Sequence, residues 1–341
     1  MLYTHIVKPL VFRKDAEEAH DMALKVSSLT NHSNILQTLA SSIYGGGKDS
    51  EQKLWGLTFK NPIGLAAGFD KNGTTPKAMQ ALGFGFVEIG SITAKPSKGN
   101  PKPRAFRLPK DQSLINRMGL NNEGTDVIIE RLKSLSLDIP LGINIAKTND
   151  ATIHGEEAIA DYLYSYQRAQ EVADYITVNI SCPNTGEGKT FEDPDTLKAL
   201  LSSLEISASK VPTLVKFSVD TDKATLNKLV EICEHFEVDG YVATNTSSVR
   251  DHLKTERQTL GKIGNGGLSG AAISEKSDLV ISHLYEILKG SKPIIGVGGI
   301  HDVESAQRKI DLGANLLQIY TGLVYEGPGL VKKLKNNLIL K

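Results

Sequence analysis

The architecture is indicated by the run Pro62-Ile63-Gly64-Leu65-Ala66-Ala67-Gly68-Phe69-Asp70-Lys71, which is the first of a series of similar units. It is an apolar run that ends in glycine and charged residues, and the Thr74-Thr75-Pro76 stretch after it is typical of a helix start. Apolar runs without strict alternation indicate parallel strands that are buried on both faces. Strands of this kind are expected at 62–67, 86–91, 141–145, 175–180, 213–217, 240–245, 293–298 and 316–320.

Amphipathic helices are expected between these strands, so a unit of strand and helix repeats along the chain. About eight such units predict an α/β protein with a (β/α)8 TIM barrel, and a doubly wound open sheet is the alternative. Residues 1–45 do not fit the repeat: helices are expected at 15–26 and 33–44, before a Gly45-Gly46-Gly47 hinge. We therefore expect an N-terminal two-helix extension at 1–45 and a barrel domain at 46–341. The extension is either a lid that seals one barrel end or an element that lies on a membrane surface.

The composition bears on the classes of partner. Lys+Arg and Asp+Glu both number 39 in the 341 residues, so the formal net charge is zero and no nucleic acid partner is expected. The two cysteines, Cys182 and Cys233, form no CxxC pair, and the histidines show no HExxH spacing, so no metal is expected. Residues 1–8 lack the long apolar run of a signal peptide or membrane-spanning helix.

Glycine, asparagine, lysine or hydroxyl residues lie at the end of every expected strand. Active sites of TIM barrels lie at the carboxyl ends of the strands, so these residues are expected to meet in one site. The Gly296-Val297-Gly298-Gly299 and Tyr320-Thr321-Gly322 turns favour a phosphate held by backbone N–H groups, with plain tight turns as the alternative. No GxGxxG motif opens a helix after the first strand, so the fingerprint of a dinucleotide site is missing.

Three types of side chain at these strand ends indicate the chemistry. Cys182 follows a strand and precedes a proline, which favours a catalytic thiol over a buried structural cysteine. Lys71 and Lys216 are expected to be functional, because burying an unpaired ammonium group is costly. Amide side chains offer donors and acceptors to a planar heterocycle with alternating C=O and N–H groups, although any single asparagine is also a common turn residue. The asparagines concerned are Asn144, Asn179, Asn184 and Asn245.

Five motifs in this sequence occur together in one known family. They are GLAAGFDK at 64–71, NRMGLNN at 116–122, NISCPNT at 179–185, GGLSG at 266–270 and IGVGGI at 295–300. On these motifs the chain resembles the dihydroorotate dehydrogenase family over nearly its whole length. The resemblance implies oxidation of dihydroorotate to orotate in de novo pyrimidine biosynthesis, with FMN bound in a TIM barrel.

The resemblance also implies which residues form the site. FMN contacts are implied for Ala67, Gly68, Lys71, Ser91, Asn144, Asn179, Lys216, Thr244, Gly270, Gly299, Tyr320 and Thr321. Substrate contacts are implied for Lys71, Asn116, Arg117, Met118, Gly119, Leu120, Asn179, Asn184, Asn245 and Thr246. Cys182 and Lys216 are the implied catalytic residues.

The N-terminal helices are similar to those of the family's class 2 branch, whose members associate with membranes and reduce quinones. This similarity implies a hydrophobic tunnel at 1–45, a peripheral position on the cytoplasmic side of the cell membrane, and a quinone site at His20, Arg104 and Tyr320. For Arg104 and Arg107 a surface charge is the alternative. Two features depart from the branch, which usually has serine at the position of Cys182 and Pro-Gly-Leu-Arg where Gly186-Glu187-Gly188-Lys189 stands here.

The mechanism that the resemblance implies gives a role to three side chains. Cys182 takes the proton next to the carbonyl as the general base, and the neighbouring carbon delivers hydride to flavin N5. Lys216 stabilises the negative charge on the reduced flavin, and Lys71 holds the substrate carboxylate. Two alternatives stay open: a soluble-type enzyme that reduces fumarate or NAD, and a non-catalytic flavin-binding barrel.

Overall fold

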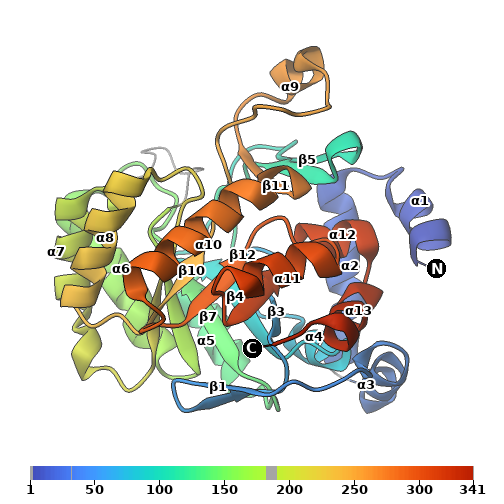
Figure 1. Ribbon diagram of the computed structural model, residues 1–341, viewed down its shortest axis with the longest axis horizontal. Helices are drawn as coiled ribbons and strands as arrows, with labels where there is room; N and C mark the ends of the chain where they lie inside the picture. The colour runs from blue at the N-terminus through green and yellow to red at the C-terminus, as the bar shows by residue number, and fades with distance from the viewer. Residues whose placement is uncertain (1–2, 32, 182–189, 341) are drawn as a thin grey trace.

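The computed structural model describes residues 3–31, 33–181 and 190–340. Its centre is a closed barrel of eight parallel strands (Figure 1). The strands are β3 (Ile63–Leu65), β4 (Phe86–Ile92), β7 (Leu141–Ile145), β8 (Tyr175–Asn179), β9 (Thr213–Phe217), β10 (Gly240–Ala243), β12 (Ile294–Val297) and β13 (Leu316–Ile319). They pair in chain order, and β13 closes the barrel against β3. The predicted TIM barrel is thus confirmed, and the open sheet is excluded.

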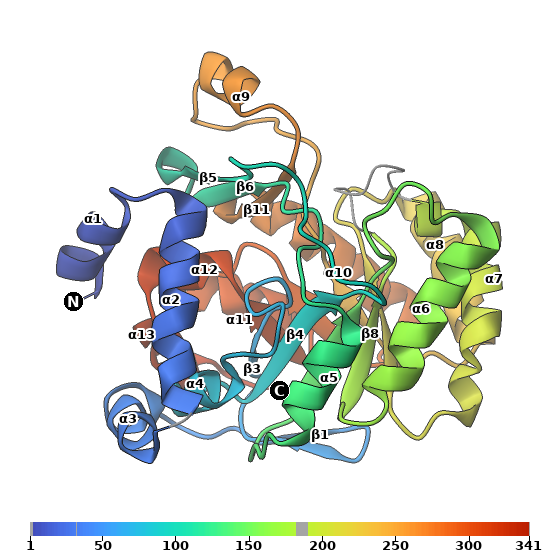
Figure 2. The same ribbon diagram turned by 180° about the vertical axis from the view of Figure 1, so that it is seen from behind.

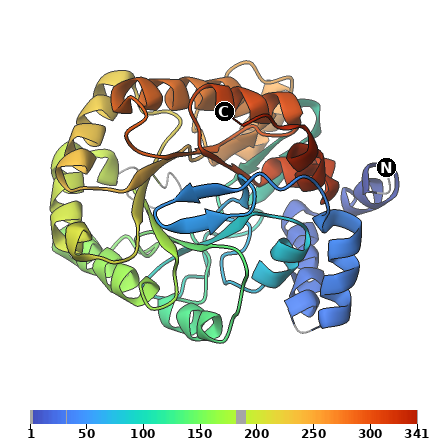
Figure 3. The same ribbon diagram turned by 60° about the horizontal axis from the view of Figure 1, so that its bottom comes forward.

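Helices surround the barrel on its outside (Figure 3). They are α4 (Pro76–Ala81), α5 (Thr125–Lys133), α6 (Gly155–Ala169), α7 (Pro194–Leu204), α8 (Lys223–His235), α10 (Ser274–Leu288), α11 (Val303–Asp311), α12 (Thr321–Glu326) and α13 (Gly329–Asn337). Aspartates 193, 222 and 302 cap α7, α8 and α11 by accepting hydrogen bonds from backbone N–H groups of the first turn. Short 3-10 turns lie at Pro109–Asp111, Thr190–Glu192, Ile206–Ala208 and Ala271–Ile273.

The barrel interior is filled in layers, because alternate residues of each strand point inward. The lowest layer is apolar and contains Phe86, Tyr175, Leu214 and Leu316. Two residues further along the same strands, the next layer is polar and contains Glu88, Thr177, Lys216 and Gln318, all buried. The polar layer lies nearer the carboxyl ends of the strands, so it is the part of the interior that a ligand can reach.

A hairpin of β1 (Gln52–Leu54) and β2 (Leu57–Phe59) covers the amino-terminal end of the barrel (Figure 3). Trp55 at its turn donates from Nε1 to the Asp239 carbonyl at 2.9 Å, and Phe59 packs edge-to-face on Phe86 with ring centroids 5.3 Å apart. This hairpin, which the sequence pattern did not predict, closes the end of the barrel opposite the expected site.

A second unpredicted element lies over the carboxyl ends of the strands. It is an antiparallel sheet of β5 (Ala105–Leu108), β6 (Ser113–Asn116) and β11 (Gly267–Gly270), with β6 in the middle. Before β11 the chain makes an excursion that includes the short helix α9 (Arg257–Ile263), which projects from the molecule in Figures 1 and 2. The sheet supplies wall residues for the cavity described below.

The N-terminal extension contains the two predicted helices, α2 (Ala16–Asn31) and α3 (Asn34–Ala40). A π-helical turn (Tyr3–Val7) and α1 (Lys8–Val11) precede them, and another π-helical turn (Ser41–Gly45) follows. The long helix α2 runs along one side of the barrel (Figure 2), with Glu17 and Ala19 buried against it. In the part of the chain that the structure describes, none of the helices has the length and apolar character needed to span a bilayer.

Candidate active site

One cavity of about 590 Å³ extends from the carboxyl ends of the strands to helix α2. Cavities of this size and shape are typical of sites for cofactors and small molecules. Predicted site residues that line it are Ala67, Gly68, Lys71, Ser91, Asn116, Met118, Gly119, Leu120, Asn179, Lys216, Thr244, Asn245, Thr246, Gly270, Gly299, Tyr320, Thr321 and His20. Three others, Arg104, Arg117 and Asn144, do not line it. Cys182 and Asn184 lie outside the described residues.

Two ammonium groups reach the cavity, that of Lys216, which is buried, and that of Lys71, which is partly buried. Lys216, on β9, is 5% exposed, and burial lowers its pKa although Glu88 opposes the shift. The Lys71 ammonium donates to the Gly68 carbonyl at 2.9 Å, and burial, aided by the charge of Arg104, lowers its pKa to about 8. Both groups are therefore positioned to meet negative charge on a ligand.

A glycine loop after β12 forms another wall. Gly298 and Gly299 have positive φ angles of 120° and 78°, and a Cβ on Gly299 would lie 2.5 Å from the Cα of Ser274. Only glycine fits so close to α10, and the bare backbone leaves N–H groups near the cavity. The loop is the feature from which the sequence predicted a phosphate site.

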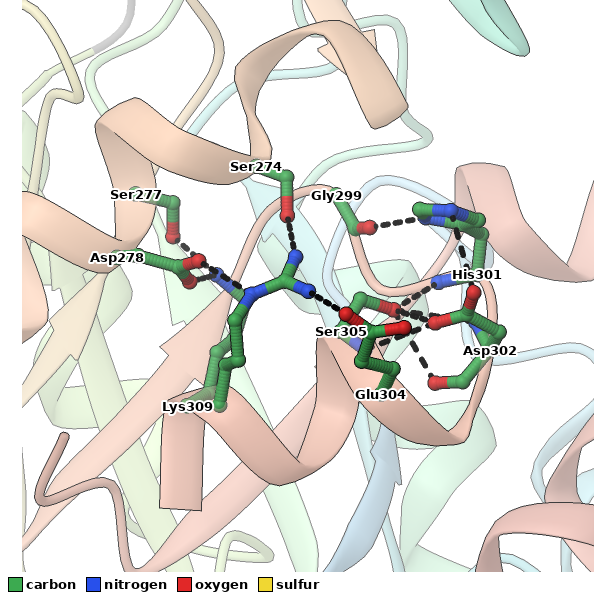
Figure 4. A network of polar contacts seen from close by, with 10 residues as sticks. Ser274, Ser277, Asp278, Gly299, His301, Asp302, Glu304, Ser305 and Lys309 are labelled. Carbon is green, nitrogen blue, oxygen red and sulfur yellow. Dashed lines mark hydrogen bonds and ion pairs between the residues drawn. The ribbon is translucent and has the colours of Figure 1, made fainter. Parts of the chain in front are cut away.

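Side chains on and near helices α10 and α11 contact this loop from outside the cavity (Figure 4). Ser277 donates to the Val297 carbonyl at 2.7 Å, directly before the glycines. The ammonium of Lys309, which is completely buried, lies 2.9 Å from the Ser277 hydroxyl and 2.7 Å from the Asp278 carboxylate. The Nδ1 atom of His301 lies 2.6 Å from the Gly299 carbonyl oxygen. Side chains outside the cavity thus fix the conformation of the loop.

The outer half of the cavity is mostly apolar and lies between α2 and the barrel. His20, on α2, packs edge-to-face on Phe69 with ring centroids 5.0 Å apart and lies 6.0 Å from the ring of Tyr320. Burial, aided by the charge of Lys71, lowers the pKa of His20 to about 4, so its ring is neutral at pH 7. Its Nε2 atom is buried without a hydrogen-bond partner among the described residues, which makes it a candidate contact for a ligand.

Arg104 and Arg107 have different places at this end of the cavity. Arg104 forms a buried ion pair with Glu17 and also donates to the carbonyls of Lys98 and Asn100. Arg107, two residues into β5, lines the cavity, and its guanidinium carbon lies 4.7 Å from the centre of the Phe12 ring. The arginine at the cavity wall is therefore Arg107, whereas the family resemblance had indicated Arg104.

The two other predicted residues outside the cavity wall have structural contacts. Arg117 donates to the carbonyls of Asn265 and Pro103 at 2.9 and 3.0 Å and so joins loops around the sheet. Asn144 is completely buried behind the wall residue Ser91, with which it shares a hydrogen bond. Among the described residues, no cluster of three or more His, Cys, Asp or Glu side chains could hold a metal ion.

Barrels of eight parallel strands carry their active sites at the end where this cavity opens, so the fold and site define a TIM-barrel enzyme. The family model of dihydroorotate dehydrogenase matches residues 50–341. The chain belongs to the dihydroorotate dehydrogenase family, as its motifs indicated.

Named relatives and solved structures agree with this family. "Dihydroorotate dehydrogenase (quinone)" of Gloeobacter violaceus is 41% identical over 98% of this chain and 93% of its own length. The protein of the same name from Synechococcus sp. is 42% identical over 99% of this chain and 92% of its own length. A crystal structure of DHODH from Eimeria tenella in complex with ferulenol superimposes with a TM-score of 0.83 at 31% identity, over 94% of this chain and 90% of that chain.

Proposed function

We propose that this chain oxidises dihydroorotate to orotate in de novo pyrimidine biosynthesis, with FMN as cofactor and a quinone as electron acceptor. The observation that carries the proposal is a single cavity with two unlike ends. Toward the strand ends it has the ammonium groups of Lys71 and Lys216 and amide side chains, which suit an anionic heterocycle. Its outer end is apolar and lies under helix α2, which suits a quinone.

The residues present fit FMN. Gln318 lines the cavity, and its Oε1 atom is a buried acceptor without a partner among the described residues, so it can receive an N–H group of a ring. The glycine loop at Gly298 and Gly299 offers backbone N–H groups to a phosphate. FMN would supply the hydride acceptor and the electron carrier that side chains cannot provide.

The family resemblance implies the roles of the chain's own residues, and the places of the described ones in the cavity support these roles. The Lys71 ammonium binds the substrate carboxylate, and Asn116, Asn179 and Asn245 offer amide groups to the ring. The Lys216 ammonium stabilises negative charge that develops on the cofactor. The Sγ atom of Cys182, which lies outside the described residues, takes the proton from the carbon next to the ring carbonyl.

The quinone would enter between α2 and the barrel, close to His20, Arg107 and Tyr320. We propose that this end rests on the cytoplasmic side of the cell membrane as a peripheral attachment. Large apolar side chains are exposed on the N-terminal extension, among them Leu10, Val26, Leu29, Ile35 and Leu39. Exposed apolar side chains gathered on neighbouring helices are typical of a membrane-facing surface.

An anaerobic titration tests the catalytic proposal and its two alternatives. Dihydroorotate should bleach the flavin absorbance of the purified protein, and a soluble quinone should restore it. Restoration by fumarate or NAD instead would identify the soluble-type enzyme. Absence of bleaching in protein that carries flavin would identify a non-catalytic flavin-binding barrel, and absence of FMN after reconstitution would reject the cofactor.

Sedimentation with phospholipid vesicles tests the membrane proposal. Replacing Leu29 and Ile35 by serine should reduce the fraction of protein that sediments, because it removes apolar surface from the extension. The matched control replaces Val127 and Leu279 by serine, since these side chains are 51% and 66% exposed on barrel helices outside the extension. Equal binding of both variants and the wild type would reject this membrane surface.

A further inference from the structure

Glu88, on β4, is a carboxylate with no solvent exposure in the polar layer beneath the cavity. Four donors surround it from three other strands. They are Nδ2 of Asn144 at 2.9 Å, Nε2 of Gln318 at 2.7 Å, the hydroxyl of Tyr175 at 3.1 Å and the hydroxyl of Thr177 at 3.2 Å. All four hydrogen bonds are donated to the carboxylate oxygens, so each of these groups points a hydrogen at Glu88.

The first consequence is a hydrogen-bond chain with one direction. Because Nδ2 of Asn144 faces Glu88, its Oδ1 faces Ser91 and accepts the hydrogen of the Ser91 hydroxyl. The Ser91 oxygen then accepts from Nδ2 of Asn179 at 3.1 Å. Oδ1 of Asn179 in turn accepts from Nδ2 of Asn245 at 3.2 Å. The chain leads from a buried carboxylate to three residues that line the cavity.

The second consequence concerns Gln318. Because its Nε2 is held by Glu88, its Oε1 is presented as an acceptor at the cavity wall, where it has no partner among the described residues. A buried acceptor without a partner is costly unless a ligand supplies a donor. Glu88 therefore fixes the orientation of amides on two separate routes to the cavity.

We propose that Glu88 is a positioning residue that sets which amide atoms donate and which accept in the ligand site, through Asn144 on one route and Gln318 on the other. The proposal rests on the proposed function, and its ligands are the planar, imide-bearing rings of flavin and orotate. Without Glu88 the Gln318 amide could rotate and exchange its donor with its acceptor, because the two ends have nearly the same shape. On the other route the backbone of Ser181 supports the same direction, since its N–H donates to Oδ1 of Asn179 and its carbonyl accepts from Nδ2 of Asn245. Because the direction is fixed, the amide donors and acceptors of the site lie in the order that complements the N–H and C=O groups of the ring.

The test compares Glu88→Gln with Tyr175→Phe in FMN-loaded protein. Glutamine keeps the shape of Glu88 but has an NH2 group in place of one carboxylate oxygen, so it opposes either the Asn144 donor at Oε1 or the Gln318 donor at Oε2 and permits that amide to rotate. Tyr175→Phe removes a donor from the same carboxylate and a contact of the Gln318 side chain, but it leaves the carboxylate of Glu88 in contact with Asn144 and Gln318. Orotate affinity is measured from the change in the flavin absorbance spectrum, and FMN retention from the fluorescence of released flavin on dilution.

We expect Glu88→Gln to weaken orotate binding and FMN retention by about tenfold or more, the effect of a misplaced buried donor, while Tyr175→Phe stays within about threefold of the wild type. Glu88→Gln should also raise the flavin reduction potential, because a rotated Gln318 amide offers the ring a donor in place of an acceptor and so favours added electrons. A purely structural role would lower thermal stability in both variants and leave the potential unchanged. Ligand affinities of Glu88→Gln within threefold of Tyr175→Phe would overturn the proposal.

If the Glu88→Gln protein does not fold, a second variant tests the proposal. Asn144→Ala breaks the first route at a residue outside the cavity wall and leaves Glu88 and Gln318 in contact. Orotate affinity should fall by about tenfold, since the Ser91 hydroxyl loses its acceptor Asn144 and no longer presents only its oxygen to Nδ2 of Asn179. Unchanged orotate affinity would reject the relay. Failure of the wild type to bind FMN or to be bleached by dihydroorotate would instead reject the proposed function.

Discussion

Arg104 and Glu17 form an ion pair that is buried between helix α2 and the barrel. The guanidinium Nη2 lies 2.8 Å from the carboxylate Oε1, and the exposed fractions of the two residues are 6% and 4%. Lys102 adds a second cation at 3.1 Å from the same oxygen. The pair attaches the N-terminal extension to the loop before β5, close to the outer end of the cavity.

Replacing Glu17 by glutamine should destabilise the protein by about 3–5 kcal/mol, because it leaves the Arg104 charge buried and unpaired. Quinone reduction should decline more than flavin reduction by dihydroorotate, since α2 lies at the quinone end. Burial raises the pKa of Glu17, but hydrogen bonds and charges from Arg104 and Lys102 lower it by a larger amount, so the pKa lies below its usual 4.5. The stability that the pair contributes is thus present at neutral pH and is lost as the pH falls through this lowered pKa.

Thermal unfolding at several pH values, together with stopped-flow measurement of both half-reactions, checks this prediction. Glu18→Gln is the matched control, because Glu18 is an exposed neighbour on the same helix. If the two variants have the same stability at pH 7, the buried pair does not hold α2 in place.

Orotate affinity should depend on pH through Lys71. The pKa of Lys71 is lowered to about 8, mainly by burial, so the free protein loses the ammonium charge above that pH. Binding of the orotate carboxylate should therefore be strongest below pH 8 and should weaken by up to about tenfold per pH unit above it. Titration of the flavin spectrum with orotate between pH 6.5 and about 9.5 measures the effect.

Lys71→Arg provides the comparison, since a guanidinium stays charged through this range. Its orotate affinity should not decline between pH 8 and about 9.5. A wild-type profile that is equally flat would mean that Lys71 does not bind the carboxylate in its charged form.

Lys309→Met should weaken FMN retention although Lys309 does not line the cavity. The substitution leaves Asp278 buried without its ammonium partner, which typically costs about 3–5 kcal/mol, and it loosens the support of the Gly298-Gly299 loop. Combining Lys309→Met with Asp278→Leu should recover much of the lost stability, because no unpaired charge remains. Differential scanning fluorimetry and FMN release by dilution measure the two effects.

Arg308→Ala is the control for this pair. Its side chain is 43% exposed and also contacts Asp278, so its loss should change stability by less than about 1 kcal/mol. Lys309→Met and Arg308→Ala proteins that release FMN equally fast would show that the buried pair has no role in the loop.

Cys182→Ala should slow flavin reduction by about 10²–10⁴-fold with FMN and orotate still bound, the usual contribution of a general base. Cys182→Ser should keep activity but move its rise to higher pH, because a hydroxyl is a weaker acid than a thiol. Alkylation should inactivate the protein through Cys182, since Cys233 is completely buried and burial raises the pKa of its thiol. Stopped-flow reduction across pH measures both variants.

The control is Cys233→Ala, which should remain sensitive to alkylation and protected by orotate. Reduction of the flavin in Cys182→Ala within about tenfold of the wild-type rate would exclude Cys182 as the base. The base would then have to be another residue near the substrate.

The eight barrel strands could be predicted because each is a short apolar run followed by a turn and a helix signal. The antiparallel sheet could not, because β6 and β11 pair Asn116 with Gly267 across a long stretch of chain, and strands of four residues carry little pattern. The β1–β2 hairpin was also missed because its strands are too short to carry a clear pattern.

Most of the residues that line the cavity were named from the family motifs, and the convergence of strand ends in a closed barrel explains only those that follow barrel strands. The position of Arg107, rather than Arg104, at the cavity wall could not be predicted. Arg104 is buried by its ion pair with Glu17, which lies far away in the sequence on a helix before the barrel. Glu88 and Gln318 had a usable signal that was overlooked. Each stands two residues beyond a large apolar residue of a buried strand, which places both inside the barrel.

The hairpin that closes the barrel floor also determines what optical spectroscopy can report. The chain has one tryptophan, Trp55, and the hairpin fixes its indole against Asp239 and beside Phe59 and Tyr175. Its emission therefore reports the integrity of the barrel at the end remote from the cavity. Ultraviolet fluorescence should follow unfolding of the whole domain while remaining insensitive to detachment of α2. Movement of the extension has to be followed by a label placed on the extension itself.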